Sequence, residues 1–428
     1  MRVLLVAPVE QGSGEIITCL HVAENLTAHG HEVLFLASDL ACRYLAPRFG
    51  DKLRRLTQDG PANYLVWDDA LRTFRPDVVV FADYPLLYFN TGTTPLVDQP
   101  GWQHSLDTAE ACLITLDHFG FAQEEMGLFF GPPHLSLFYQ KFPAIPARMR
   151  IMLPCPMHEP GVVAGRRGSP FRYWQPPLGI DDSTRRQVRG RYMIDADQWL
   201  VVHSVPNWAW RQAEAMGLPF YQYYGAILDQ YLRDLPRKVT LVSVNNGILL
   251  KTPLDAGITL VNLEPLPTSE FEALLFAADL VLTENSVSIA MGKAICGLQP
   301  CAALVNRARL PVIMDRLSGR LKELVLEMEG ERMGTVFPYR VFPTSMMEEL
   351  ERLVLYRDNS LLDAFLEVEV FGGAATREAL LGLLADPATR ADLRHSQQRY
   401  VDRLKALGDA SSVIEALAAE ERSASVAS

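Results

Sequence analysis

Residues Ala7–Ser38 read "APVEQGSGEIITCLHVAENLTAHGHEVLFLAS". The apolar run before this stretch ends in a turn that contains two glycines, Gly12 and Gly14. An amphipathic segment follows the turn, and a second apolar run closes the stretch. This order predicts a strand, a glycine turn, a helix and a second, parallel strand. The function of the chain then depends on what the turn binds.

The same alternation recurs along the rest of the chain. Each apolar, β-branched run is bounded by turn or charged residues, and helical patterns lie between several of the runs, as expected for a doubly wound α/β fold. We therefore predict two Rossmann-like domains, each with a parallel sheet. The predicted strands begin at Val3, Glu32, Asp77 and Ala111 in the first half and at Gln198, Lys238, Gly257, Ala278 and Cys301 in the second.

Prolines crowd residues 143–177, and proline removes backbone donors and blocks helices. We therefore predict a crossing between the two domains in this region. The predicted boundaries are a first domain over residues 1–165, a crossing over 166–190, a second domain over 191–390, a C-terminal helix over 391–420 and a frayed tail over 421–428.

Composition excludes several classes of protein. The chain has 428 residues, of which 49% are hydrophobic, and a net charge of −11, which argues against nucleic acid as a partner. No apolar run is long enough for a membrane span, and the N-terminal stretch is too short for a signal peptide. The six cysteines form no CxxC pair, which favours reduced core cysteines in a cytoplasmic protein over disulfides or zinc. The oligomeric state is not predicted.

Two turns can bind a ligand at the start of a helix, where free N–H groups point outward. The first carries Gly12 and Gly14, but Ile17 replaces the third glycine of the dinucleotide motif G-x-G-x-x-G. The second is "ENSVS", residues 284–288, which follows a predicted strand. Its serines, Ser286 and Ser288, either contact an anion such as a diphosphate or simply cap the next helix.

Taken together, these motifs resemble GT-B glycosyltransferases of the UDP-glycosyltransferase and MurG-like type. Residues 12–16, "GSGEI", and 30–33, "GHEV", match the strand–G-x-G-H-[VI]–helix–GHEV opening of that family. The stretch "AADLVLTENSVSIAMGKAICGLQP" resembles the family's "A.D.VIT.GG.GT..EAL..G.P", and "FRPDVVVFADY" resembles its "PDVVV.D". The resemblance covers about three quarters of the chain.

The resemblance implies two domains facing across a cleft, with the C-terminal helix crossing back to the first domain. It implies transfer of a sugar from a nucleotide donor, of UDP or dTDP type, to a small-molecule acceptor such as a secondary metabolite or a cell-envelope precursor, without a metal or other cofactor. The acceptor would contact the first domain at Gly12, Ser13 and Gly14. The donor would contact Asn207, Trp208, Asn245, Glu264, Leu266, Glu284, Asn285, Ser286 and Ser288.

Three positions depart from the family pattern. Glu15 stands where many members have a histidine base, and it either accepts the acceptor's proton or compensates the helix dipole. Asn285-Ser286 replaces a glycine pair, which restricts the approach of the backbone to a diphosphate. Gly292, followed by Lys293, replaces the acid that holds the donor ribose.

Other candidate site residues end predicted strands of the first domain. Asp83 and Asp117 each close an apolar run, and His118 follows Asp117. They either orient an acceptor or base, or cap the following helices. In the second domain, Trp208 either stacks on a nucleobase or packs in the core.

Fold likeness alone does not fix chemistry. A nucleotide-sugar epimerase or hydrolase would use the same donor site without an acceptor. A non-catalytic binding partner of the same fold is the third alternative, because the departures affect residues that the family uses in catalysis.

Overall fold

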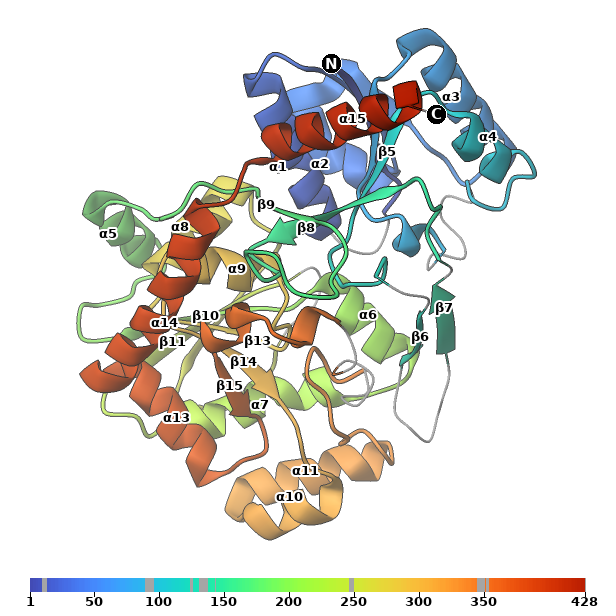
Figure 1. The fold of residues 1–428 in the computed structure, drawn as a ribbon. Coiled ribbons are helices and arrows are strands. Elements are labelled where there is room, and N and C mark those ends of the chain that lie inside the picture. The colour runs from blue at the N-terminus through green and yellow to red at the C-terminus, as the bar shows by residue number, and fades with distance from the viewer. Residues whose placement is uncertain are drawn as a thin grey trace.

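The computed structural model of the protein describes residues 1–9, 14–88, 96–123, 126–130, 138–142, 144–245, 250–344, 351 and 354–427. Two parallel β-sheets, each covered by helices, dominate these residues (Figure 1). The predicted α/β class with two parallel-sheet domains is therefore confirmed. The positions of the domain boundaries stay a prediction.

The first sheet has the strand order β3-β2-β1-β4-β5-β8-β9, and its neighbouring strands pair in parallel. β9 lies within the segment that the sequence predicts as the crossing, and β6 (Met126–Phe130) and β7 (Phe138–Phe142) form a separate antiparallel hairpin. The strands of the first sheet are β1 (Arg2–Ala7), β2 (Glu32–Ala37), β3 (Leu53–Arg55), β4 (Val78–Phe81), β5 (Cys112–Leu116), β8 (Arg150–Cys155) and β9 (Ser169–Arg172).

The second sheet has the order β12-β11-β10-β13-β14-β15, again with parallel neighbours. In both sheets the first strand lies between the second and a later one, so the strand order reverses beside β1 and beside β10. Ligands of open α/β sheets bind at such reversal points, outside the carboxyl ends of the strands. The strands are β10 (Trp199–Ser204), β11 (Val239–Val244), β12 (Thr259–Leu263), β13 (Leu280–Thr283), β14 (Cys301–Val305) and β15 (Leu366–Glu369).

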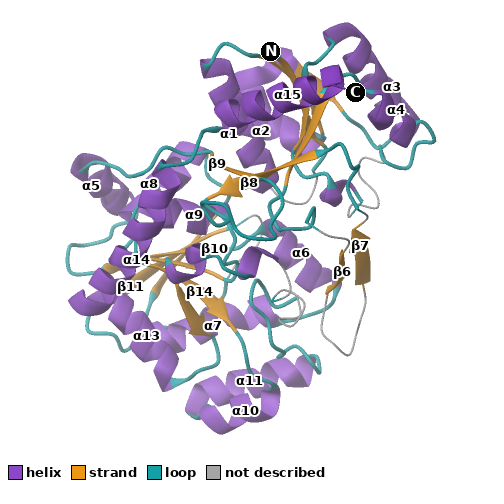
Figure 2. Ribbon diagram, viewed as in Figure 1, coloured by secondary structure: helices purple, strands orange, loops and turns teal. Residues whose placement is uncertain are grey.

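Both faces of each sheet are buried under helices (Figure 2). In β1, Val3 and Leu5 pack with α1, α2 and the last helix, α15 (Ala410–Ala427), whereas Leu4 and Val6 pack with α3 and α4 on the other face. This burial on both faces explains why the strands read as continuous apolar runs. The helices of the first domain are α1 (Gly14–Ala28), α2 (Asp39–Phe49), α3 (Gly60–Phe74) and α4 (Trp102–Thr108).

The second sheet carries α7, α11 and α13 on one face and α5, α8 and α9 on the other. No helix in the described parts of the chain is both long and apolar enough to cross a membrane. The helices of this part are α5 (Asp182–Arg191), α6 (Asn207–Ala215), α7 (Phe220–Leu232), α8 (Thr268–Ala277), α9 (Ile289–Cys296), α10 (Leu310–Arg316), α11 (Gly319–Glu331) and α13 (Ala374–Ala385).

Two helices, rather than one, occupy the C-terminal region. α14 (Pro387–Lys405) lies against the second domain, and α15 (Ala410–Ala427) lies across the first domain beside α1 (Figure 1). Ile414 and Leu417 of α15 belong to the core of the first domain.

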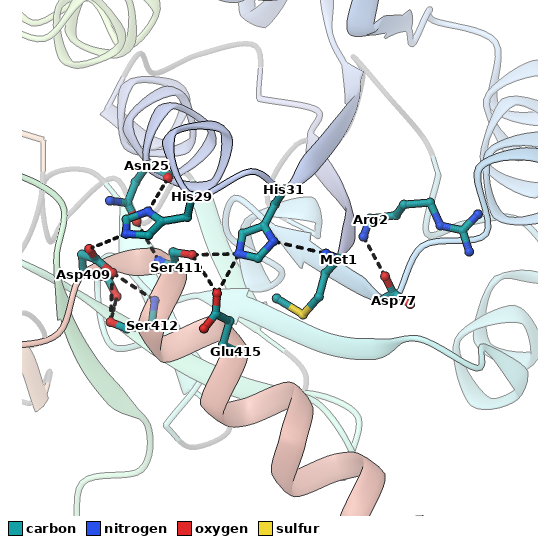
Figure 3. Close-up of polar contacts among 10 residues, drawn as sticks. All are labelled: Met1, Arg2, Asn25, His29, His31, Asp77, Asp409, Ser411, Ser412 and Glu415. Atoms are coloured by element: carbon teal, nitrogen blue, oxygen red, sulfur yellow. Dashed lines mark hydrogen bonds and ion pairs between the residues drawn. The ribbon is translucent and has the colours of Figure 1, made fainter.

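Polar contacts also hold α15 to the end of α1 and the loop after it (Figure 3). Nε2 of His31 lies 2.8 Å from Oε1 of Glu415, and the Ser411 amide donates to Oδ1 of Asn25 at 2.7 Å. The last helix therefore completes the domain that the first strand begins.

Candidate active site between the two domains

A cavity of about 240 Å³ lies where the carboxyl ends of the strands of the two sheets face each other. Gly14 opens α1 on one wall and Ile289 opens α9 on the other. A Cβ atom built on Gly14 would lie 3.6 Å from Cγ1 of Ile289, so the two helix starts are in van der Waals contact range. Each helix N-terminus carries a partial positive charge. Two such ends therefore converge on one cavity.

The turn of residues 284–288, which precedes α9, caps the start of this helix at the cavity. The Ser288 hydroxyl caps α9 by accepting from the Met291 amide at 3.0 Å, and Oδ1 of Asn285 accepts from the Val287 amide at 3.1 Å. Because the first amides of a helix have no acceptor within it, those of Ile289 and Ala290 are available to a ligand. Both residues line the cavity.

Lys293 adds a basic side chain to the same wall, one helical turn after Ile289. Its Nζ lies 2.5 Å from Oε1 of Glu272 and 5.3 Å from the centre of the Trp174 ring. Burial lowers the pKa of Lys293, and the charge of Glu272 opposes that change. It is the only lysine or arginine among the described residues that line the cavity.

A cluster of buried acids and a histidine forms the opposite wall. Glu15 and His118 line the cavity, and Asp83 lies behind His118, with Oδ2 at 3.6 Å from Nδ1 of the ring. The amides of His118 and Leu86 donate to Asp83 at 3.3 and 3.2 Å, so backbone groups fix this carboxyl. Asp117 is also buried and accepts from Nε2 of Gln123 at 3.1 Å.

Burial shifts the protonation of this cluster. It raises the pKa of Glu15, Asp83 and Asp117, and the charge of Asp83 adds to the rise at Asp117. Burial lowers the pKa of His118, against the charges of Glu15 and Asp117. A neutral imidazole has a free lone pair that can accept a proton, and carboxyls whose pKa is raised are more basic than exposed ones. Oε2 of Glu15 and both ring nitrogens of His118 lack a hydrogen-bond partner among the described residues.

Most of the predicted site residues meet at this cavity, although their roles stay predictions. Asp83, Asp117, Glu284 and Ser286 are buried behind its walls, and the Ser286 hydroxyl lies 3.3 Å from that of Tyr356. The predicted residues that line the cavity are Gly14, Glu15, His118, Trp208, Asn245, Leu266, Asn285 and Ser288.

The remaining predicted residues are Gly12, Ser13, Asn207 and Glu264. Gly12 and Ser13 lie outside the described residues, and Asn207 opens α6 but its side chain is not described. Glu264 is exposed beside Pro265, which lines the cavity. The ring of Trp208 packs edge-on against Phe342 at 4.1 Å between ring centres.

The structure explains why glycine occupies position 292. A Cβ atom there would lie 3.0 Å from both Cγ and the carbonyl oxygen of Pro156 and 3.4 Å from the Trp174 ring. The residues that directly follow β8 and β9 therefore pack on this turn of α9. Sequence reasoning could not find this contact, because Pro156 and Trp174 are more than 100 positions away in the chain.

No group of three or more His, Cys, Asp or Glu side chains in the described ranges is arranged to hold a metal ion.

Comparison with solved structures agrees with this architecture. The chain is similar to Anabaena Alr3699/HepE in complex with UDP-glucose (12% identity, 99% of this chain and 100% of that one, TM-score 0.53). It is similar to Arabidopsis thaliana UGT89C1 complexed with quercetin (12%, 98% of each chain, TM-score 0.53). It is also similar to the spinosyn rhamnosyltransferase SpnG (14%, 97% of this chain and 100% of that one, TM-score 0.52). The protein therefore has the GT-B fold.

Comparison at the level of sequence gives a family but no curated relative. None of the curated proteins compared with the sequence matches it. The family described as "Family of unknown function (DUF6365)" matches residues 22–423. Because this match spans nearly the whole chain, the protein belongs to the DUF6365 family.

Proposed function

We propose that the protein transfers a sugar from a nucleotide-activated donor to the hydroxyl group of a small-molecule acceptor. The observation that carries this proposal is the convergence of the N-termini of α1 and α9, with Lys293, on a cavity that also contains buried bases. Such an arrangement stabilises the negative charge of a leaving diphosphate while a proton is removed nearby. The similarity to structures solved with UDP-glucose and with quercetin supports the proposed sugar transfer.

In the proposed reaction the acceptor hydroxyl gives its proton to Nε2 of His118. The acceptor oxygen forms a bond to the anomeric carbon of the sugar. The bond from that carbon to the diphosphate oxygen breaks, and its electron pair leaves with the nucleoside diphosphate. Asp83, which faces Nδ1, stabilises the imidazolium that forms, and Glu15 orients the acceptor hydroxyl.

The donor would lie on the second domain, with its diphosphate at the start of α9 and at Lys293. These groups supply the positive charge that the leaving group requires, so the proposed chemistry needs no metal. We infer a donor of UDP or dTDP type and an acceptor bound against the first domain. Apolar side chains that line this domain's wall, including Ile17, Leu40 and Phe119, suit a largely apolar acceptor.

A matched pair of variants tests the donor site. Ile289→Asp places a carboxylate at the first position of α9, where it occupies the anion site, and Ile289→Asn has the same shape without the charge. Like charges at close range should reduce nucleoside diphosphate affinity by on the order of 10-fold or more in the Asp variant relative to the Asn variant. Calorimetry and thermal shift against nucleoside diphosphates and nucleotide sugars measure this difference. Equal affinity in the two variants would place the donor elsewhere.

A second candidate function rests on the acid cluster. Three carboxyl groups and a histidine within one wall exceed what a single proton transfer requires, which favours epimerisation or hydrolysis of a nucleotide sugar as the alternative. NMR of the enzyme with a bound nucleotide sugar and no acceptor distinguishes these functions, because only the alternative predicts rapid release of free or epimerised sugar. Binding without turnover under any condition would instead indicate a non-catalytic binding protein.

A further inference from the structure

A chain of buried hydrogen bonds runs from the cavity into the second domain. Nδ2 of Asn245 donates to Oγ of Ser243 at 2.9 Å, and this oxygen lies 3.3 Å from Nδ1 of His203. Nε2 of His203 lies 2.8 Å from Oε1 of Glu284. Asn245 lines the cavity, whereas Ser243, His203 and Glu284 are fully buried. We call these four residues the Asn245 chain.

The chain follows the sheet across three neighbouring strands. Ser243 lies near the end of β11, His203 lies opposite it in β10, and Glu284 directly follows β13. Polar residues at these positions do not contribute to the apolar packing of the sheet. Burying them has a free-energy cost unless their hydrogen bonds are satisfied. The mutual hydrogen bonds offset this cost and hold the side chains in one arrangement.

Glu284 sets the direction of each hydrogen bond. A carboxylate oxygen accepts hydrogen bonds, so this contact suits the tautomer of His203 whose Nε2 carries the hydrogen and donates to Glu284. In the neutral ring Nδ1 then accepts from the Ser243 hydroxyl, and the oxygen of Ser243 accepts from the amide NH₂ of Asn245. The amide of Asn245 is thereby fixed with its NH₂ toward the chain. Its carbonyl oxygen remains as an acceptor for a ligand in the cavity.

The position of Asn245 relative to the anion site identifies the part of the ligand that it meets. β11 lies two strands from β13, whose following turn opens α9, and two strand spacings span about 10 Å. This separation matches the distance between the phosphates of a nucleotide and its base. Pro265, Leu266 and Phe271, which also line the cavity, supply an apolar surface for a planar ring.

We infer that Asn245 accepts a hydrogen bond from the ring N–H of the donor's nucleobase, and that Ser243, His203 and Glu284 are positioning residues that prevent its amide from reversing. This inference rests on the proposed function. It specifies a base with a ring N–H at this edge, as in uracil and thymine, and disfavours cytosine, whose N3 carries a lone pair. Two acceptors would face each other if cytosine were bound.

UDP and CDP test the inference, since the two nucleotides have nearly the same shape and differ at this edge of the base. The wild-type protein should bind UDP more tightly than CDP by on the order of 10- to 100-fold, the usual cost of a mispaired buried hydrogen bond. Ser243→Ala should reduce this ratio toward 1, because the amide is then free to reverse. Glu284→Gln should also reduce it, because a glutamine can donate to His203 and so reverse the whole chain.

Two controls separate positioning from folding. Asp229→Asn removes another fully buried carboxyl of the second domain, one that accepts from the Gly257 amide at 2.8 Å and pairs with Arg233. This variant should leave the UDP-to-CDP ratio unchanged. Inorganic diphosphate should bind the wild type and Ser243→Ala equally, because it has no base.

The outcomes are distinct. An unchanged UDP-to-CDP ratio in folded Ser243→Ala and Glu284→Gln proteins would overturn the inference and leave the proposed function intact. A wild-type preference for CDP would overturn the inference and the proposed UDP or dTDP type of the donor, but not the proposed sugar transfer. If Ser243→Ala lost as much affinity for inorganic diphosphate as for UDP, the Asn245 chain would belong to the phosphate site and not to the base site. A wild-type protein that binds no nucleotide would overturn the proposed function and the inference together.

Discussion

Nδ1 of His118 lies 3.6 Å from Oδ2 of Asp83, and both side chains are buried beside the cavity between the domains. The contact gives the imidazole two different edges: Nδ1 faces a carboxyl group held by two backbone amides, and Nε2 remains for a substrate. A proton that arrives at Nε2 creates a cation beside the Asp83 carboxyl, and the charges of Glu15 and Asp117 favour that cation. This relationship makes His118, rather than Glu15, the stronger candidate for the general base.

Replacing the two candidate bases separately tests this assignment. His118→Gln should reduce turnover by on the order of 10²–10⁴-fold, the usual contribution of general-base catalysis. Glu15→Gln, which keeps the shape and a hydrogen-bonding group, should lose less. Steady-state kinetics with a donor and acceptor pair measures both, and nucleotide affinity should stay unchanged in each. A larger loss in Glu15→Gln would reverse the two roles.

The buried acids also predict how stability depends on pH. Burial raises the pKa of Asp117 in the folded protein, and the charge of Asp83 raises it further, so the folded state holds this proton more tightly than the unfolded state. The contribution of Asp117 to the free energy of unfolding is therefore fully present below the unfolded pKa, and it is lost as the pH rises through the folded pKa. Asp117→Asn removes that loss. The melting temperature of the variant relative to the wild type should increase between pH 4 and pH 8.

Asp181 provides a control of opposite sign. It caps α5, and hydrogen bonds from Thr184 lower its pKa. Its contribution to stability is present above the unfolded pKa and is lost as the pH falls through the folded pKa. Asp181→Asn should therefore lose stability relative to the wild type as the pH rises. The same trend in both variants would contradict the assignment of the Asp117 shift to burial.

Lys293 should contribute to the affinity for a nucleotide but not to the affinity for its nucleoside. Lys293→Met removes the cation near the start of α9, and a hydrogen bond to a charged group contributes about 1.5–3 kcal/mol, so UDP affinity should fall on the order of 10- to 100-fold. Uridine affinity should change little. Glu272→Gln, which removes the partner of Lys293, should not weaken UDP binding. Equal losses for UDP and uridine would indicate that Lys293 only supports the wall.

Gly292 should tolerate no larger side chain. Gly292→Ala pushes a methyl group against Pro156, and overpacking of this kind costs about 1–3 kcal/mol of unfolding free energy. Gly190→Ala, near the end of α5, meets no atom within 4 Å and should be neutral or stabilising by up to about 1 kcal/mol. Urea denaturation measures both. A stable Gly292→Ala protein would show that the segment at Pro156 moves away from α9 at little cost.

The fold was largely predictable because its strands are buried on both faces. The runs at Val3, Glu32, Asp77 and Ala111, and the five in the second half, are all strands of the two sheets, as predicted. β3 was missed because "LRR" at Leu53–Arg55 is an edge strand without an apolar pattern, and β15 because "LEVE" is short and half charged. β8 and β9 were missed because the prolines of residues 143–177 predicted a crossing, whereas both strands belong to the first sheet. Edge strands pack on fewer neighbours, so their sequences carry a weaker signal.

The site was predictable where it follows strand ends and not where it depends on distant contacts. Glu15, His118 and Asn285 follow predicted strands, and all three line one cavity. The pairing of His203 with Glu284 was missed, because a polar residue inside a predicted strand gives no sign of its partner. The contact of Pro156 with Gly292 depends on how the two domains meet, which local sequence patterns do not encode.

The position of α15 has a consequence for synthesis of the protein. Val22 and Ala23 of α1 share a core with Ile414 and Leu417, which leave the ribosome almost 400 residues later. During translation the first domain therefore cannot complete its core until the second domain has been synthesised, and an apolar face of α1 stays uncovered until then. Newly made chains should consequently be most prone to aggregation, and most dependent on chaperones, in the interval before α15 emerges.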